Sequence, residues 1–285
     1  MSSVYIPENY KSNLTVYETQ DAIEVIKRTF EKKITSNLNI RRVSAPLFVE
    51  SSSGLNDDLN GVERAVAFDI KETGTNAQIV HSLAKWKRKA LKDYGFSEGE
   101  GLYTNMNAIR RDEDMDNIHS IYVDQWDWEK VIAEKHRTKE FLKETVNAIA
   151  ICIYETLERL KEVYPQVKTS LPKEVSFITT QAIEDTYPTL SSQDRENAYT
   201  KEHKCVFLME IGDLLKSGKK HDGRAPDYDD WKLNGDLLYW NETLQSALEI
   251  SSMGIRVDKA SLELQLKLAG CEDRKNLPFH KALLN

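Results

Sequence analysis

The chain contains Leu102-Tyr-Thr-Asn-Met-Asn-Ala-Ile-Arg110 and His119-Ser-Ile-Tyr-Val-Asp-Gln-Trp-Asp-Trp128, two strand-like runs separated by the charged loop 111–117. Runs of this kind on either side of a short polar loop are typical of paired antiparallel strands. We therefore expect these two runs to pair with each other as antiparallel strands.

Further strands and helices are predicted on both sides of this pair. Apolar and polar residues suggest strands over 40–49 (interrupted by Pro46), 65–70, 78–81, 205–209, 236–240 and 247–253. Thr15 and Glu18 fit a helix capping box, apolar residues recur at helical spacing from 142 to 164 before Pro165, and another helix is expected over 259–268. Without a linker or repeat, this order predicts a single mixed domain over 1–285, of the α/β or the α+β class.

Composition narrows the class of protein. The chain has 285 residues, 40% of them hydrophobic, and 39 basic against 46 acidic side chains give a net charge of −7, which disfavours a general nucleic-acid coat protein. The longest apolar run, 148–154, is far below the ~18 residues of a membrane span, and no secretion signal is recognisable. Without such a signal, we expect a cytoplasmic protein. Three widely spaced cysteines argue against a disulfide framework and a zinc site.

Several nucleotide-binding signatures are absent. The run 212–220 has five residues between its glycines where a P-loop has four, and Gly99-Glu-Gly101 lacks the third glycine of a Rossmann fingerprint. Any phosphate chemistry must therefore use another arrangement.

Polar side chains interrupt the strand that ends at Trp128. Strict alternation places Gln125 and Asp127 on the face of Ile121 and Val123. A buried amide and carboxylate need partners, which a ligand would supply. The alternative is that this face becomes solvated towards the strand end.

A second polar group falls in the strand 247–253. Alternation puts Glu249 and Ser251 on the face of Ala247 and Met253, with Ser252 and Arg256 close by. A carboxylate beside hydroxyls and an arginine is the set of groups that Mg²⁺ and nucleotide phosphates require.

Two charged runs also have two interpretations each. The run 81–89 carries four cations and could clamp an anionic substrate, although a solvated helix face is the commoner explanation. The run 224–231 carries three carboxylates, which suit an ammonium group or a metal as well as they suit an ordinary acidic loop.

Taken in order, seven segments closely resemble the ammonia-dependent asparagine synthetases, aspartate–ammonia ligases related to class II aminoacyl-tRNA synthetases. The resemblance runs from about Tyr5 to the last residue. Its segments are Asp57-Asp-Leu-Asn-Gly61, Val80-His-Ser-Leu-Ala-Lys-Trp-Lys-Arg88, Gly99-Glu-Gly-Leu-Tyr-Thr104, Val123-Asp-Gln-Trp-Asp-Trp-Glu129, Arg224-Ala-Pro-Asp-Tyr-Asp-Asp-Trp231, Leu233-Asn-Gly-Asp236 and Glu249-Ile-Ser-Ser-Met-Gly-Ile-Arg256.

This resemblance implies a fold, a reaction and partners. The fold would be an antiparallel sheet of the class II synthetase type flanked by helices, in a homodimer that uses ATP and Mg²⁺. The β-carboxylate of aspartate would attack the α-phosphate of ATP to give β-aspartyl-adenylate and pyrophosphate, and ammonia would then displace AMP to form asparagine. Such chemistry needs cations where two anions meet.

The resemblance also assigns roles to residues of this sequence. It implies catalytic roles for Lys87, Arg110 and Gln125. It implies substrate binding by Asp57, Ser82, Asp127, Asp229 and Ser251, nucleotide binding by Arg110, Glu249, Ser252 and Arg256, and metal binding by Glu249.

At the C-terminus, this sequence departs from the family's pattern. The family continues into a glycine-rich strand and helix with a nucleotide-binding arginine, and we expect that segment to be missing here, which would leave an exposed sheet edge and a weaker ATP site. The alternative function is therefore a truncated or non-catalytic protein that binds aspartate, asparagine or an adenylate. Charging of tRNA has no support, because the sequence shows no anticodon-binding module.

Overall fold

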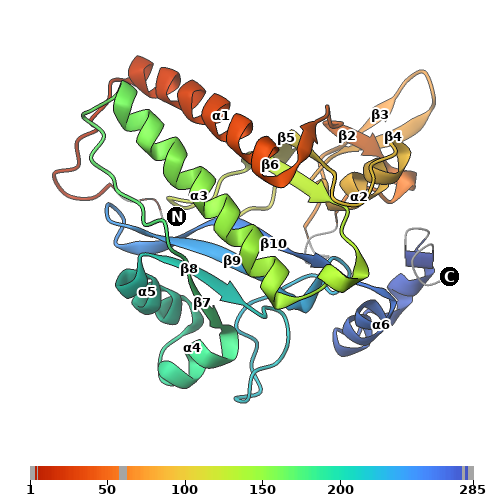
Figure 1. Ribbon diagram of the computed structural model, residues 1–285. Helices are drawn as coiled ribbons and strands as arrows, with labels where there is room; N and C mark the ends of the chain where they lie inside the picture. Colours follow the sequence, from red (N-terminus) through yellow and green to blue (C-terminus); the bar gives the residue numbers. More distant parts are fainter. Residues whose placement is uncertain (1–3, 5, 58–62, 278–279, 282–285) are drawn as a thin grey trace.

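The computed structural model describes residues 4, 6–57, 63–277 and 280–281 (Figure 1). Within these residues ten strands form three sheets, and the helices pack around them. The mixed α+β class predicted from the sequence is confirmed. The apolar end expected at 277–284 and the segment 58–61 lie largely outside the described residues.

The predicted strand pair forms the middle and edge of the first sheet. Its order is β1 (Ile40–Arg42), β5 (Gly101–Ile109) and β6 (Tyr122–Lys130), with β5 and β6 antiparallel and β1 parallel to β5. β6 begins later than expected, because Asp116 Oδ1 accepts hydrogen bonds of 2.7 Å from the backbone N–H groups of Ile118 and His119. These bonds hold the residues before β6 in a turn.

The second sheet contains the later strands in the order β10 (Ser246–Arg256), β9 (Asp229–Asn241), β8 (Cys205–Met209) and β7 (Ser176–Thr179). β10, β9 and β8 are antiparallel, whereas β7 runs parallel to β8. The bounds of β8 match the sequence prediction, while β9 and β10 extend further at both ends.

The third sheet is small and antiparallel, in the order β2 (Phe48–Glu50), β4 (Thr75–Ile79) and β3 (Ala67–Ile70). The run 40–49 was predicted as one strand interrupted by Pro46. The two parts, β1 and β2, belong to different sheets, because the proline has no N–H to continue a ladder.

Two long helices cover one face of the larger sheets. α1 (Val16–Leu38) lies along α3 (Lys139–Val163) (Figure 1). Phe30 and Ile34 of α1 and Val146 of α3 share a core with Tyr103 of β5 and Leu237 of β9. The capping box predicted at the start of α1 is present, with reciprocal bonds between Thr15 and Glu18.

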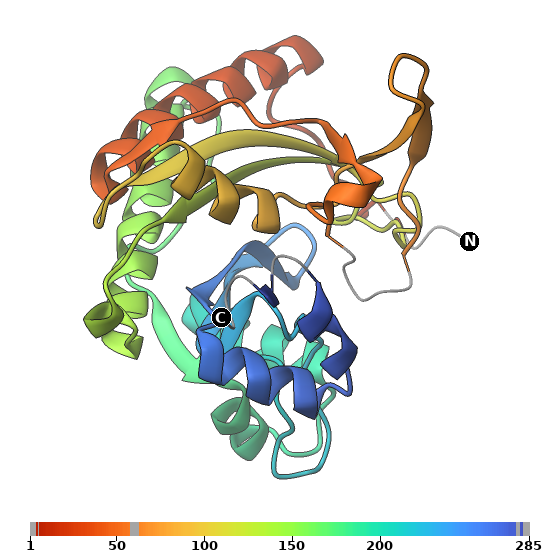
Figure 2. The same cartoon turned by 90° about the vertical axis from the view of Figure 1, so that its right-hand side faces the viewer.

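Shorter helices cover the remaining faces. α4 (Thr180–Thr186) and α5 (Ser192–His203) pack on the opposite face of β8 and β9, and neither was predicted. α2 (Ala84–Asp93) and α6 (Lys259–Leu268) lie on the side that Figure 2 turns towards the viewer. The 3₁₀ turns are η1 (Ser51–Ser53), η2 (Glu134–His136) and η3 (Glu272–Asn276). None of the described helices has the length and apolar character needed to cross a lipid bilayer.

Candidate active site

A cleft of about 1820 Å³ lies between β6 and β10, which are edge strands in the described part of their sheets. α2 and the loop 222–229 also contribute to its walls. All eleven residues to which the sequence analysis gave a role line this cleft, although what each does there stays a prediction. They are Asp57, Ser82, Lys87, Arg110, Gln125, Asp127, Asp229, Glu249, Ser251, Ser252 and Arg256.

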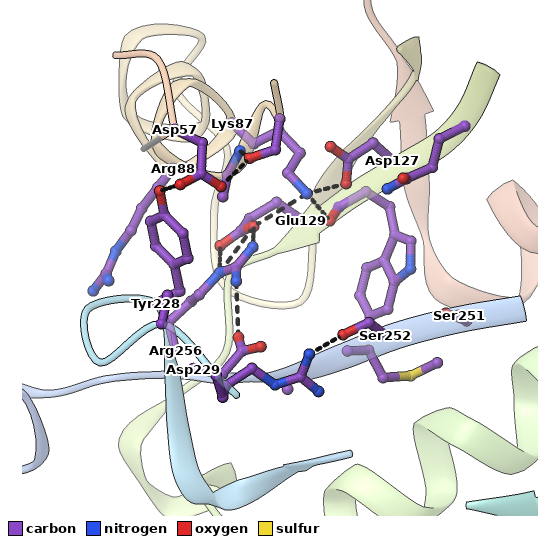
Figure 3. Close-up of a pocket in the computed structure, with 18 of the residues that line it drawn as sticks. Asp57, Lys87, Arg88, Asp127, Glu129, Tyr228, Asp229, Ser251, Ser252 and Arg256 are labelled. Atoms are coloured by element: carbon purple, nitrogen blue, oxygen red, sulfur yellow. Dashed lines mark hydrogen bonds and ion pairs between the residues drawn. The ribbon is translucent and has the colours of Figure 1, made fainter. Parts of the chain in front are cut away.

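Asp57 is held in place from two sides. Ser82 Oγ donates to its Oδ2 at 2.7 Å, and the Tyr228 hydroxyl donates to its Oδ1 (Figure 3). Behind it, Asn56 Oδ1 accepts from the backbone N–H groups of Asp57 and His81, both at 2.9 Å. The buried His81 ring places Nδ1 3.1 Å from the backbone oxygen of Asp57. The Asp57 carboxylate is therefore fixed and aimed into the cleft.

Lys87 lies on the buried face of α2, one turn after Leu83 and one turn before Ala90 and Leu91. Its Nζ donates to the Asp127 carboxylate and, at 3.1 Å, to the backbone oxygen of Trp128. A buried ammonium is stable only with such partners. The alternation predicted for β6 explains the position of the first partner, since it turns the Asp127 side chain towards α2.

Arg256 of β10 reaches across to β6. Its Nε and Nη2 donate to the two carboxylate oxygens of Glu129 at 2.9 and 2.6 Å, and its Nη1 donates to Asp229 Oδ1 at 2.8 Å (Figure 3). Burial alone would raise the pKa of Glu129, but the charges of Arg256 and Lys87 outweigh it and keep that pKa below its usual range. Glu129 and Arg256 are therefore both charged at neutral pH.

Arg224 organises the other end of the cleft. Its Nη2 donates to Asp236 Oδ1 at 2.6 Å and its Nη1 donates to Ser252 Oγ. Glu249 is open to the cleft, but limited hydration, with added repulsion from Asp236, raises its pKa to about 7. A cation bound near Glu249 would relieve this repulsion.

The expectation that Glu249 and Ser251 share one face of a regular strand is wrong. The register of β10 shifts between them, so that Glu249 lies opposite Leu238 and Ser251 opposite Leu237. Neighbouring residues of β9 point to opposite faces. A β-bulge therefore separates the two side chains, although both still border the cleft.

The side chains of Arg110 and Gln125 make few polar contacts with the rest of the described protein. Arg110 follows β5, and its buried Nε has no hydrogen-bond partner among the described residues, with Glu113 Oε2 3.9 Å from its Nη1. Gln125 is exposed on the β6 face that borders the cleft. Both side chains can therefore donate to a ligand.

Four residues of the site were missed by the sequence analysis: Glu129, Tyr228, Arg224 and Asp236. Glu129 continues the alternation of Gln125 and Asp127, which was a usable signal. The other three lie within segments that carry the family resemblance. Their roles depend on contacts between strands and loops that are distant in sequence.

The arrangement provides cations and carboxylates for a charged substrate with several groups. Lys87, Arg110 and Arg224 can neutralise anions, while Asp57, Asp127 and Asp229 can bind an ammonium group. The described residues contain no cluster of three or more metal-binding side chains. Mg²⁺ usually needs only one or two carboxylates together with substrate phosphates, so Glu249 fits that ion in the presence of a nucleotide.

Comparison with known proteins gives consistent matches. A family model described as aspartate-ammonia ligase matches residues 17–285. The aspartate--ammonia ligase of Ruminiclostridium cellulolyticum is 58% identical over 286 residues, covering 100% of this chain and 85% of the relative. The Clostridium tetani ligase is 58% identical over 280 residues (98% and 82%), and the Lactobacillus johnsonii ligase 58% over 284 residues (99% and 84%).

Solved structures show the same fold at low identity. Asparaginyl-tRNA synthetase of Entamoeba histolytica in complex with asparaginyl-adenylate has a TM-score of 0.62 at 11% identity, covering 95% of this chain and 64% of that chain. The Pyrococcus horikoshii enzyme complexed with asparaginyl-adenylate has a TM-score of 0.57 at 17% identity, covering 92% and 60%. The class II synthetase fold predicted from the sequence is confirmed.

Proposed function

Because this chain belongs to the aspartate–ammonia ligase family, an enzyme family that makes asparagine from aspartate and ammonia, we propose that its cleft activates aspartate with ATP through a β-aspartyl-adenylate. The observation that carries this proposal is the position of Lys87, a buried cation that lies among the acidic side chains of the cleft. It offers a positive charge beside carboxylates that suit an ammonium group.

The acidic wall would bind the α-ammonium group of aspartate. Asp57, fixed by Ser82 and Tyr228, presents its carboxylate there, and Asp127 and Asp229 lie in the same cleft. The β-carboxylate would then lie near Lys87, whose ammonium is shared with Asp127 in the structure. Exchange of a protein carboxylate for a substrate carboxylate keeps that cation paired.

The chemistry has two steps. An oxygen of the β-carboxylate forms a bond to the α-phosphorus of ATP, and the bond from that phosphorus to the β-phosphate oxygen breaks, releasing pyrophosphate. Ammonia then attacks the activated carbonyl carbon with its lone pair, loses a proton, and AMP leaves. Arg110, whose buried Nε has no partner in the described part of the chain, would hold the α-phosphate as charge collects on it, and Gln125 would orient the reacting carboxylate.

Nucleotide and metal would occupy the β10 end of the cleft. We place the phosphates near Ser252 and Arg224, and Mg²⁺ at Glu249, whose pKa is raised by limited hydration and by repulsion from Asp236. When bound, Mg²⁺ would neutralise phosphate charge. Ser251 would contact substrate.

We also propose a homodimer in the cytoplasm. Apolar side chains of the β2–β4–β3 sheet are exposed, and the Phe48 and Phe68 rings meet edge to face with centroids 5.2 Å apart beside Leu47. Such a patch suits a protein interface. Light scattering on size-exclusion chromatography should give twice the 32.8 kDa chain mass, and a monomer at micromolar concentration would contradict this part of the proposal.

The activity is tested by aspartate-dependent release of pyrophosphate from ATP and Mg²⁺, with and without ammonium. K87A should abolish it, and K89A, on the exposed side of the same helix, should not. Pyrophosphate release that does not depend on aspartate, or that persists in the K87A variant, would refute the proposed function.

A further inference from the structure

Glu129 and Arg256 form an ion pair that joins the two sheets across the cleft. We call this pair the Glu129–Arg256 clasp. Glu129 lies on β6 and Arg256 on β10, and two nearly parallel hydrogen bonds connect their side chains (Figure 3). Glu129 is only 6% exposed, so solvent screens the contact weakly.

Each partner of the clasp also contacts a residue of the proposed aspartate site. Glu129 Oε2 lies 3.8 Å from Lys87 Nζ on α2. Arg256 Nη1 donates to Asp229 Oδ1 at 2.8 Å. A continuous chain of charge contacts therefore links Lys87 on one wall of the cleft with Asp229 on the other.

The β10 end of the clasp is itself anchored. Arg137, near the start of α3, donates to the backbone oxygen of Arg256 and, at 3.0 Å, to Asp230. The end of β10 and the start of β9 are thus tied together at the point where the guanidinium leaves the strand. These bonds restrain the backbone from which the Arg256 side chain projects.

We propose that Glu129 and Arg256 are positioning residues that set the distance between Lys87 and Asp229, so that the two charged ends of aspartate meet their partners together. This inference rests on the proposed function. It gives Arg256 a different role from the nucleotide contact expected from the sequence, because its Nε, Nη1 and Nη2 all donate to carboxylates.

The test compares two buried Glu–Arg pairs. E129Q removes one charge of the clasp with little change of shape. E184Q is its matched control: Glu184 is 7% exposed and lies 3.1 Å from Arg195 Nη1, in a pair that lies outside the cleft. Loss of either charge should lower the melting temperature, since each leaves a buried arginine poorly paired.

Kinetics separate positioning from support of the fold. We expect E129Q to raise KM for aspartate at least about tenfold while KM for ATP changes less than about threefold, because misplacement by about 1 Å can cost two orders of magnitude. E184Q should leave both KM values unchanged. In an R256Q background, E129Q should have little further effect, since the clasp is already broken.

A second variant covers the case in which E129Q does not fold. E129D keeps the charge but shortens the side chain by one methylene, so its carboxylate should not serve Lys87 and Arg256 together, and KM for aspartate should rise. Unchanged KM for aspartate in the folded E129Q or E129D protein would overturn the inference while leaving the proposed function intact. A wild-type chain that neither releases pyrophosphate nor is stabilised by aspartate would contradict both.

Discussion

Replacement of Lys87 by glutamine should separate catalysis from stability. Lys87 is 3% exposed, and its Nζ contacts Asp127, the backbone oxygen of Trp128 at 3.1 Å and Glu129 at 3.8 Å. At an effective dielectric constant of about 20, the attraction at 3.8 Å alone is about 4 kcal/mol before desolvation is counted. Removal of one partner from a buried pair costs about 3–5 kcal/mol, so K87Q should melt several degrees below wild type.

The catalytic loss should be larger than the loss of folded protein explains. Removal of one preorganised donor typically lowers kcat about 10²–10³-fold, and we expect K87Q to lose that much in aspartate-dependent pyrophosphate release. The decisive comparison is K87Q/D127N, in which the orphaned carboxylate is also neutralised. This double variant should regain most of the melting temperature but none of the activity.

Two results would refute this reasoning. One is a K87Q enzyme whose kcat stays within about threefold of wild type, far from the expected loss. The other is a double variant that recovers activity together with stability, because Lys87 would then serve the fold alone.

Three further predictions concern the walls of the cleft. Y228F removes a hydrogen bond to the Asp57 carboxylate, and since such a bond contributes about 1.5–3 kcal/mol, KM for aspartate should rise at least about tenfold in steady-state assays; no change would exclude this support. H81N can keep a donor near the position of Nδ1, which contacts the backbone oxygen of Asp57, whereas H81Q cannot, so H81N should retain more activity, and the reverse order would contradict the assigned contact. Burial alone would raise the pKa of Asp227, but the His280 imidazole, whose Nε2 lies 3.1 Å from Asp227 Oδ2, brings it below its usual range; the contact therefore stabilises the fold fully above the unfolded pKa of about 4 and is lost as the pH falls below it. Melting curves should show D227N destabilised at neutral pH and converging with wild type in acid, and a pH-independent difference would disprove the linkage.

Local signals in the sequence predicted the elements whose stability is local. The capping residues Thr15 and Glu18 and the stop at Pro165 fixed the ends of α1 and α3, and the bounds of α6 were predicted without error. β7, α4 and α5 escaped prediction because they carry weak patterns. α5, for example, buries Arg195 and Thr200 rather than an apolar stripe.

In the candidate site, too, local features could be predicted from the sequence, whereas features that depend on a distant strand could not. Alternation along β6 indicated Gln125 and Asp127, and the structure brings Asp127 to Lys87. The bulge between Glu249 and Ser251 could not be predicted, because a one-residue register shift depends on the partner strand. Glu129 had a usable local signal in the same alternation, but its pairing with Arg256, 127 positions away in sequence, left no trace that the sequence alone could show.

The most direct test of the proposed chemistry uses aspartate labelled with ¹⁸O in its β-carboxylate. Attack of that carboxylate on the α-phosphorus, followed by displacement with ammonia, should leave one ¹⁸O in AMP and none in pyrophosphate, as measured by mass spectrometry of the products. Formation of ADP, or of AMP without the label, would show that aspartate is not activated as its adenylate in this cleft.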